Sequence, residues 1–211
     1  MDEKKDDGYT CEVCGGEAEL LIEGFDTVKD VMKIGSMNCR HCSSAEDVAF
    51  PEQTDDFLKA VGIALTREKE AHLFYKKAAQ KTSSGKGKDM FNQLAAFEMN
   101  HYKKIAHLCH SLQRSGRWVP YLGQEELKPS QRLAELKEKK NTKQDDIDAL
   151  TMAISKEEEA AALYREMAEK TEDPTGRDMF KKLTAEEEVH QKILNAQLYS
   201  LANQGIWLWG D

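Results

Sequence analysis

The 211-residue sequence contains only four prolines, and it has no long uninterrupted apolar run. No window approaches the eighteen or so apolar residues that a membrane-spanning helix requires, so we expect no helical membrane span. Charged residues make up 32% of the chain and hydrophobic residues 40%, a balance that favours solvent-facing amphipathic helices over sheet. The sequence therefore predicts a mainly α-helical protein.

An excess of positive charge is also missing, because the net charge is −8. The phosphate backbone of a nucleic acid calls for a basic surface, so we expect no nucleic-acid partner. The opening MDEKKDDG is polar and acidic and lacks the apolar core of a signal peptide. These absences predict a cytoplasmic protein with no membrane partner.

Cysteines are few, five in all, and four of them form two CxxC pairs separated by 24 residues. In a cytoplasmic chain this arrangement points to a metal and not to disulfides. It is typical of a tetrahedral four-thiolate site for zinc or a single iron, and so small a module needs a metal to fold. We predict a four-cysteine metal-binding β module over residues 1–50, with a short hairpin between the pairs. Its candidate ligands are Cys11, Cys14, Cys39 and Cys42. The fifth cysteine, Cys109, is predicted to be a buried small hydrophobe.

The most informative feature of the chain is an internal repeat. Residues 65–82 align without a gap with residues 154–171, and residues 87–104 with residues 176–193, always 89 positions apart. The matching pairs include Glu68 and Glu157, Tyr75 and Tyr164, Gly87 and Gly176, Glu98 and Glu187, His101 and His190, and Trp118 and Trp207. Chance does not hold one register over such a distance, so the chain contains a duplicated unit.

Each repeat unit, 52–118 and 145–207, predicts an αα-hairpin. In the first unit SSGKG separates two helical patterns, and in the second EDPTG does the same. The connection over residues 116–146 is far longer than antiparallel neighbours need, as in four-helix bundles with a long crossover. We therefore predict a four-helix bundle over residues 51–211.

Every predicted helix carries one glutamate within its apolar stripe, and the second helix of each unit adds a histidine three residues later. Four buried carboxylates are untenable alone, whereas two divalent cations cancel their charge, −4 against +4. One Glu from each of two helices with Glu-x-x-His from each of the other two is the di-metal carboxylate pattern, and mixed oxygen and nitrogen ligands favour iron or manganese. The candidate metal ligands are Glu68, Glu98, His101, Glu157, Glu187 and His190.

A surface role is the alternative to this site. A single Glu-x-x-His on a charged helix is ordinarily a solvated pair. Two copies at one offset, each with a glutamate 30 residues upstream, favour the metal site instead. The neighbouring Glu70 and Glu159 also repeat, but they lie on the outer faces of their helices and are interpreted as surface charges.

The pattern Glu-x-x-Ala-x-x-x-Tyr followed by Glu-x-x-His, present twice, resembles the rubrerythrin branch of the ferritin-like superfamily over about residues 55–205. The resemblance implies a ferritin-like di-iron bundle and a homodimer. It also implies roles for the site residues: Glu68 and Glu157 as terminal ligands, Glu98 and Glu187 as bridges, His101 and His190 as one nitrogen ligand per metal, and Tyr75 and Tyr164 as tyrosines that hydrogen-bond the site. These eight residues are the candidate catalytic set.

Two features depart from that family. Typical rubrerythrins carry an additional carboxylate one turn after the ligand of the third helix, where this chain has Ala160, with Ala71 in the first copy. The site therefore looks symmetric, closer to other ferritin-like di-iron centres. The rubredoxin-like module of rubrerythrins is more often C-terminal, and here the four-cysteine module is N-terminal, which leaves iron and zinc both open for it.

The resemblance implies an enzyme, a non-haem di-iron oxidoreductase acting as a peroxidase in oxidative stress. It would reduce hydrogen peroxide or O2, with electrons relayed through an iron in the four-cysteine site from an external reductase. A ferroxidase or iron-handling protein with a structural zinc ribbon is the first alternative, supported by the symmetric ligand set. A non-catalytic metal-sensing or interaction protein is the second. The sequence decides neither the metal of the four-cysteine site, nor the activity, the electron donor or the oligomeric state.

Overall fold

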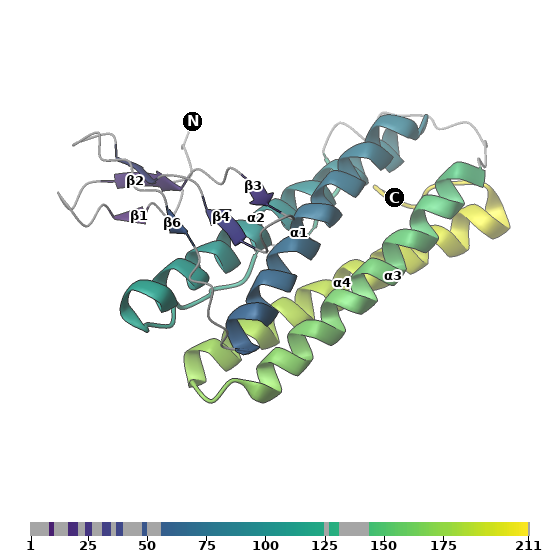
Figure 1. Ribbon diagram of the computed structural model, residues 1–211. Helices are drawn as coiled ribbons and strands as arrows, with labels where there is room; N and C mark the ends of the chain where they lie inside the picture. The colour runs from purple at the N-terminus through teal and green to yellow at the C-terminus, as the bar shows by residue number, and fades with distance from the viewer. Residues whose placement is uncertain are drawn as a thin grey trace. The chain divides into compact units, whose positions relative to one another are not determined.

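The computed structural model describes residues 9–10, 17–20, 24–26, 31–34, 37–39, 48–49, 56–124, 127–130 and 144–210. By its internal contacts the chain divides into two units, Met1–Asp56 and Phe57–Asp211. Figure 1 shows short strands in the first unit and long helices in the second.

The strands of the first unit form two three-stranded antiparallel sheets. One sheet has the order β1-β2-β5, with β1 at Tyr9–Thr10, β2 at Glu17–Leu20 and β5 at Met37–Cys39. The other has the order β3-β4-β6, with β3 at Gly24–Asp26, β4 at Val31–Ile34 and β6 at Val48–Ala49. The β3–β4 pair, with Phe25 opposite Met32, lies in the stretch between the two CxxC pairs. Cys11, Cys14, Cys42 and the side chain of Cys39 lie outside the described part of the chain, and so does the predicted four-cysteine site.

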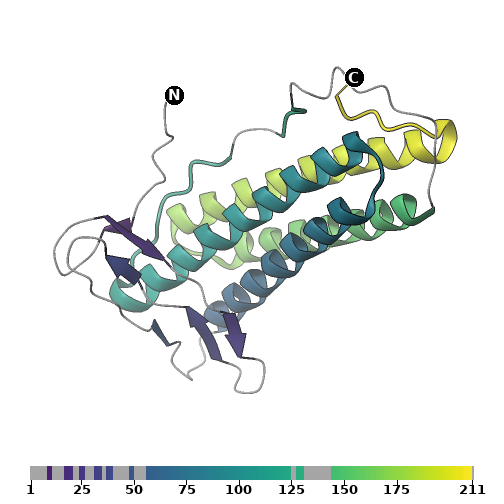
Figure 2. The ribbon, with the colours of Figure 1, turned by 90° about the horizontal axis from the view of Figure 1, so that it is seen from above.

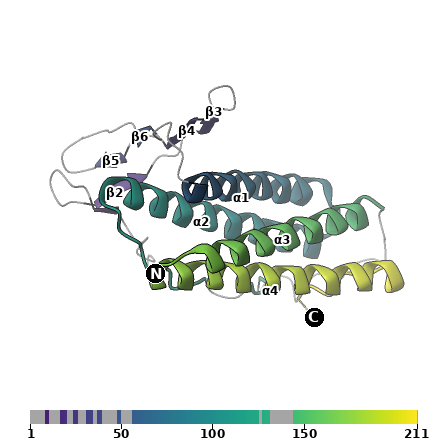
Figure 3. The same cartoon turned by 60° about the horizontal axis from the view of Figure 1, so that its bottom comes forward.

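In its described residues the second unit has four long helices, as predicted. They are α1 (Asp56–Lys81), α2 (Gly85–Ser115), α3 (Gln144–Lys170) and α4 (Pro174–Gln204). The short turns α1–α2 and α3–α4 make two hairpins, and Figures 2 and 3 show one hairpin lying along the other. The four-helix bundle with a long crossover is therefore confirmed. None of the described helices combines the length and hydrophobicity that a membrane span requires.

The duplication also reproduces the signals that end the second helix of each hairpin. Gly116 and Gly205, 89 positions apart, adopt left-handed φ angles of 64° and 70°, and their N–H groups donate to the carbonyls of Leu112 and Leu201. Glycine reaches this conformation at no steric cost, which is why it closes helices in this way. At the starts, the Ser84 and Asp173 side chains accept from backbone N–H groups of the first turns.

The two repeat units are joined by a reciprocal contact of tryptophan with glycine. Trp207, at the end of the second unit, lies against Gly87 at the start of α2. Trp118, at the end of the first unit, lies against Gly176 at the start of α4. A Cβ atom on either glycine would fall 2.7 or 2.3 Å from the facing indole ring. Only glycine leaves room for these rings, so the tryptophan at the end of each hairpin packs against the other hairpin.

Asp89 anchors both single-copy segments of this unit, the crossover and the C-terminal tail. Its carboxylate accepts hydrogen bonds from the hydroxyl and N–H of Ser130 in the crossover. It also accepts from the indole N–H of Trp209 in the tail, at 2.8 Å. The tail is held a second time by Gln197, whose side-chain oxygen accepts from the backbone N–H of Trp209.

Candidate metal centre

The six candidate metal ligands lie together in the interior of the bundle. Each helix contributes a glutamate, and α2 and α4 add their histidines, as the apolar stripes predict. None of the six is more than 2% exposed: Glu68, Glu98, His101, Glu157, Glu187 and His190. So many buried ionisable groups in one place call for compensation of their charge.

These residues form two groups of four, each of which could hold a metal ion. One group is Glu68, Glu98, His101 and Glu187, and the other is Glu98, Glu157, Glu187 and His190. Within each group one potential ligand atom per residue lies within 4.8 Å of all the others. Glu98 and Glu187 belong to both groups, and the other four residues belong to one group each.

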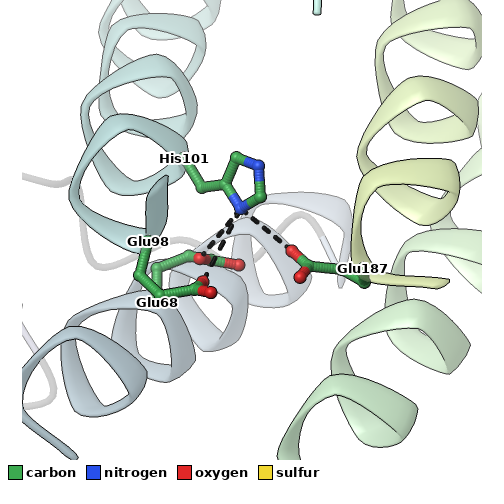
Figure 4. Close-up of side chains that lie close together, drawn as sticks. All are labelled: Glu68, Glu98, His101 and Glu187. Carbon is green, nitrogen blue, oxygen red and sulfur yellow. Dashed lines mark ion pairs between the residues drawn. The ribbon is translucent and has the colours of Figure 1, made fainter. Parts of the chain in front are cut away.

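The first group surrounds the Nδ1 atom of His101 (Figure 4). This nitrogen lies 2.9 Å from Oε1 of Glu187, 3.4 Å from Oε2 of Glu68 and 3.6 Å from Oε2 of Glu98. The Glu98–His101 pair comes from one face of α2, where the i, i+3 spacing directs both side chains to the same point.

The second group repeats this arrangement around Nδ1 of His190. That nitrogen lies 3.1 Å from Oε2 of Glu187, 3.6 Å from Oε2 of Glu157 and 3.7 Å from Oε1 of Glu98. Glu98 and Glu187 thus turn one oxygen toward each imidazole, which is the disposition of carboxylates placed between two centres. The two imidazole rings stack with centroids 6.0 Å apart.

Two tyrosines fix the carboxylates that belong to a single group. Tyr75 on α1 donates its hydroxyl proton to Oε1 of Glu157 on α3, and Tyr164 on α3 donates to Oε1 of Glu68 on α1. Each hydrogen bond crosses from one repeat unit to the other. Since Oε1 is held by a tyrosine, Oε2 of each glutamate is the atom turned toward the histidine.

The tyrosine rings are supported by aromatic side chains that lead to the ends of the bundle. Tyr75 stacks on Phe91 with centroids 6.2 Å apart, and Phe91 meets Trp207 edge-on at 5.7 Å. Tyr164 stacks on Phe180 at 6.3 Å, and Phe180 meets Trp118 edge-on at 6.3 Å. These two ladders link the reciprocal tryptophan contacts to the glutamates of the centre.

The pKa values of several groups in the cluster are raised, as expected where buried carboxylates lie close together without a compensating cation. Burial raises the pKa of Glu98 well above its usual range, and the charge of Glu187 raises it further. Burial and Glu187 likewise raise the pKa of Glu157 to about 8. Burial lowers the pKa of a histidine, yet the neighbouring carboxylates of Glu157 and Glu187 bring that of His190 to about 9. Without a cation the site retains protons to balance its carboxylates.

Glu187 behaves in the opposite way, because it lies between the two imidazoles. Burial alone would raise its pKa, but the charges of His101 and His190 and the hydrogen bond from His190 hold it well below its usual range. The pKa of His101 is raised well above its own usual value, chiefly by the charge of Glu187, although burial lowers it. Glu187 is therefore held ionised between the two imidazoles.

Several polar atoms of the cluster have no hydrogen-bond partner within the described residues. They are Oε2 of Glu68, Oε1 of Glu98, Oε1 of Glu187 and Nδ1 of His101. Buried polar atoms are nearly always paired, so these four atoms point to a missing partner. Carboxylate oxygens and imidazole nitrogens are the donor set of non-haem iron and manganese. The residues present therefore fit a pair of divalent cations.

Glu186, which the helix periodicity does not single out, also belongs to the centre. Its Oε2 atom lies 2.8 Å from Nε2 of His101 and accepts a 2.6 Å hydrogen bond from the hydroxyl of Tyr121 in the crossover. Its Oε1 atom accepts from the backbone N–H of Gln124. Partial burial would raise its pKa, but these donors hold it below the usual value. A carboxylate on the outer nitrogen of a ligand histidine fixes the orientation and tautomer of the ring.

Other residues with ligand-type side chains, or at ligand positions of related proteins, lie apart from the cluster. Cys109 is free and fully buried, as predicted, and burial raises its pKa to about 12. His72 points elsewhere, with its Nδ1 atom 2.6 Å from the carbonyl of Ala95. Ala160, where rubrerythrins carry a further carboxylate, and its counterpart Ala71 offer no ligand atom.

Comparison with known proteins gives a family match for part of the chain. The rubrerythrin family model matches residues 148–205, which cover most of α3 and all of α4. No curated protein matches the chain. Among solved structures, a hypothetical protein from Pyrococcus furiosus is 28% identical, with a TM-score of 0.56 over 72% of this chain and 93% of its own.

A second solved structure is a two-domain protein from Anabaena variabilis containing DJ-1/ThiJ/PfpI-like and ferritin-like domains. It is 15% identical, with a TM-score of 0.52 over 76% of this chain and 46% of its own. Together with the family match, this likeness places the bundle in the ferritin-like fold class.

Proposed function

We propose that the chain is a di-iron oxidoreductase that reduces hydrogen peroxide, or O2, at the buried carboxylate–histidine cluster. The observation that carries this proposal is the pair of overlapping four-residue groups that share Glu98 and Glu187. The rubrerythrin match over α3 and α4 supports iron as the metal. The proposed roles are terminal ligation by Glu68 and Glu157, bridging by Glu98 and Glu187, and one nitrogen ligand per metal from His101 and His190.

When bound, two ferrous ions would each supply one electron to cleave the O–O bond of hydrogen peroxide, which takes up two protons and leaves as two waters. The protein's part is to hold six ligand side chains in a buried interior, where their charges are weakly screened. Tyr75 and Tyr164 keep one oxygen of each terminal glutamate turned inward. Glu186 fixes the ring of His101.

The electrons would have to be replaced after each reaction. We propose that the four-cysteine module carries an iron that passes them on one at a time, supplied by an external reductase. The spacing of the cysteines supports such a site, since both iron and zinc take four thiolates. The cysteines lie outside the described residues, so this relay is proposed from the sequence alone.

A ferroxidase is the second candidate, and the symmetry of the ligand set favours it. Ala71 and Ala160 leave both metal positions with the same protein ligands, two shared glutamates, one further glutamate and one histidine. In that case ferrous iron is the substrate and the product leaves as ferric iron. The two candidates differ in whether the oxidised metal stays bound.

Metal analysis of matched double variants tests the site. The variant Glu98→Ala with Glu187→Ala removes both shared carboxylates. The variant Glu70→Ala with Glu159→Ala removes two repeat-related glutamates from the exposed faces of α1 and α3. We expect two irons in the bundle of the wild type and of the outer-face variant, and none in the bundle of the first variant. Full iron loading of that variant would contradict the ligand assignment.

A titration of the anaerobic, iron-loaded wild type then distinguishes the candidate reactions. For a peroxide reductase, one equivalent of hydrogen peroxide oxidises both irons, and they remain bound for re-reduction. For a ferroxidase, added ferrous iron continues to be oxidised and ferric iron accumulates beyond two per chain. A site that stays ferrous in the presence of both oxidants would refute each proposal and favour a non-catalytic metal sensor.

A further inference from the structure

A small pocket reaches the metal centre beside His190. It has a volume of about 230 Å³ and lies between α2, α4 and the crossover. Its wall includes Phe97, Gln124, Leu127, Ala185, Val189 and His190, and the side chains of Lys182 and Glu186 complete it. His190 is the one ligand candidate in this wall, and half of the lining residues are apolar. The pocket therefore extends to one ligand candidate of the otherwise buried cluster.

The repeat explains why the two histidines differ in this respect. At the offset of 89, Phe97 on α2 corresponds to Glu186 on α4. The ligand candidates and the two tyrosines have the same residue type at repeat-related positions in both units. Phe97 and Glu186 differ in residue type, although both lie beside the cluster. Glu186 sits against the outer nitrogen of His101, whereas Phe97 meets the ring of His190 edge-on with centroids 5.3 Å apart.

The His101 side of the cluster is closed by a hydrogen-bonded plug. Glu186 is held by the Tyr121 hydroxyl at 2.6 Å and by the Gln124 N–H at 2.8 Å. Tyr121 is itself only 3% exposed, and Lys182 donates to its carbonyl. Both Tyr121 and Gln124 come from the crossover, which occurs once in the chain. The outer nitrogen of His101 is therefore covered by Glu186, which is held by a segment without a counterpart; Gln124 of that segment also forms part of the pocket wall.

The His190 side carries an aromatic ring in place of the carboxylate. Phe97 has no polar atom that could seal the approach with hydrogen bonds, and the pocket persists between it and Val189. One molecule of water occupies about 30 Å³ in the liquid. A pocket of about 230 Å³ therefore admits a molecule of two or three heavy atoms with ease, but not a large substrate.

We propose that this pocket is the entrance through which a small uncharged oxidant, hydrogen peroxide or O2, reaches the metal position of His190. The identity of the entering molecule rests on the proposed function, whereas the entrance itself is inferred from the pocket alone. The apolar part of its wall disfavours charged molecules, because these would lose hydration on entry. The oxidant thus meets the two metal positions unequally, although their protein ligands are the same.

Identical substitutions at repeat-related positions test this entrance. Ala185 lines the pocket, and its counterpart Ala96 on α2 does not; both side chains are exposed, so a larger residue is tolerated at each. We expect Ala185→Trp to slow oxidation of the reduced, iron-loaded protein by hydrogen peroxide at least tenfold. Ala96→Trp should stay within twofold of the wild type, and both variants should bind two irons in the bundle.

A second readout needs neither iron nor turnover. Apolar cavities take up xenon, and the apolar part of this wall, formed by Phe97, Leu127, Ala185 and Val189, is expected to do the same. Crystals of the metal-free wild type and of Ala96→Trp, pressurised with xenon, should show it between Phe97 and Val189. Crystals of Ala185→Trp should not. If Ala185→Trp fails to load metal, Val189→Phe, at a 41% exposed side chain in the same wall, takes its place in both measurements.

The outcomes separate this inference from the proposed function. If Ala185→Trp is oxidised at the wild-type rate, the inference that this pocket is the entrance is refuted, whatever the reaction is. If the wild-type iron is not oxidised at all, the proposed function fails, and xenon binding alone decides whether the pocket is open. Equal slowing by Ala96→Trp and Ala185→Trp also refutes the inference, because only one of the two positions lines the pocket.

Discussion

Replacing Gly176 by alanine tests the reciprocal contact that joins the two hairpins. The added Cβ would lie 2.3 Å from Cε3 and Cζ3 of Trp118 and 2.7 Å from Cη2. Carbon atoms that are not bonded approach to about 3.5–4.0 Å, so the indole ring has to move by roughly an ångström or more. The ring is packed edge-on against Phe180, which supports Tyr164 beneath it, so this movement cannot be confined to the surface.

The expected cost follows from two opposing effects. Overpacking a well-packed site costs about 1–3 kcal/mol. Alanine regains about 0.5–1 kcal/mol over glycine within a helix. We therefore expect Gly176→Ala to lower the free energy of unfolding by about 1–2 kcal/mol, which for a domain of this size lowers the melting temperature by about 2–8 °C. Displacement of Tyr164 should also weaken metal binding, since its hydroxyl holds Glu68.

Urea unfolding of the metal-free protein, followed by circular dichroism, measures this change, and a double-mutant cycle isolates its cause. In a Trp118→Leu background the clash is absent, so Gly176→Ala should there be neutral or slightly stabilising. Gly87→Ala is the repeat-related comparison, and its smaller overlap with Trp207 at 2.7 Å predicts a smaller loss. An undiminished cost of Gly176→Ala without Trp118 would refute the reasoning, as would a single variant as stable as the wild type.

Two further predictions concern charge. Asp89→Asn should destabilise the bundle by about 1–2 kcal/mol near neutral pH, because Asp89 accepts charge-assisted hydrogen bonds from Ser130 and Trp209. The control is Asp178→Asn, at the exposed repeat-related position, which should have little effect on stability. Partial burial raises the pKa of Asp89, but these hydrogen bonds leave it below the usual value, so its contribution is present above about pH 4 and is lost as the pH falls through the folded-state pKa. Urea unfolding at several pH values should show the gap between wild type and Asp89→Asn closing in acid; a constant gap would contradict this. Binding of two divalent cations near pH 7 should release about four protons, which calorimetry in buffers of different ionisation enthalpy can measure. The affinity for the cations should therefore fall as the pH is lowered. Binding without proton release would contradict the charge balance. The groups expected to lose these protons are Glu98, His101, Glu157 and His190.

The fold was predictable because duplication and helix periodicity act over long stretches. The offset of 89 shows which segments are equivalent, and the glycines and caps around 83–87 and 172–176 mark where each hairpin turns. The spacing of three and four residues then selects which glutamates face inward. Burial of Glu68, Glu98, Glu157 and Glu187 follows from helical geometry alone, without knowledge of how the hairpins pack.

The contacts between segments were not predictable in the same way. The repeat pairs Trp118 with Trp207, but it is silent on which glycine each ring covers, and both rings lie on the opposite unit. Glu186 was hidden for a different reason. It is adjacent to Glu187, outside the inward-facing stripe, and its partner Tyr121 comes from the crossover, which has no periodic pattern. Only the packed structure brings these residues to His101.

The difference between repeated and single-copy residues also bears on how a duplicated site can offer different access to its two metal positions. Two identical hairpins related by a pseudo-twofold axis can build only a symmetric cage, because every ligand on one side has its copy on the other. Asymmetry has to come from a point difference between the copies or from a segment that occurs once. Here both sources meet at Glu186, which replaces the phenylalanine of the other copy and is held by Tyr121 and Gln124 of the crossover. Selection for equal ligands and for one open side can therefore act on separate residues. Substitutions at position 97 should alter access to the centre without removing a ligand, whereas a substitution at position 186 would also release the ring of His101.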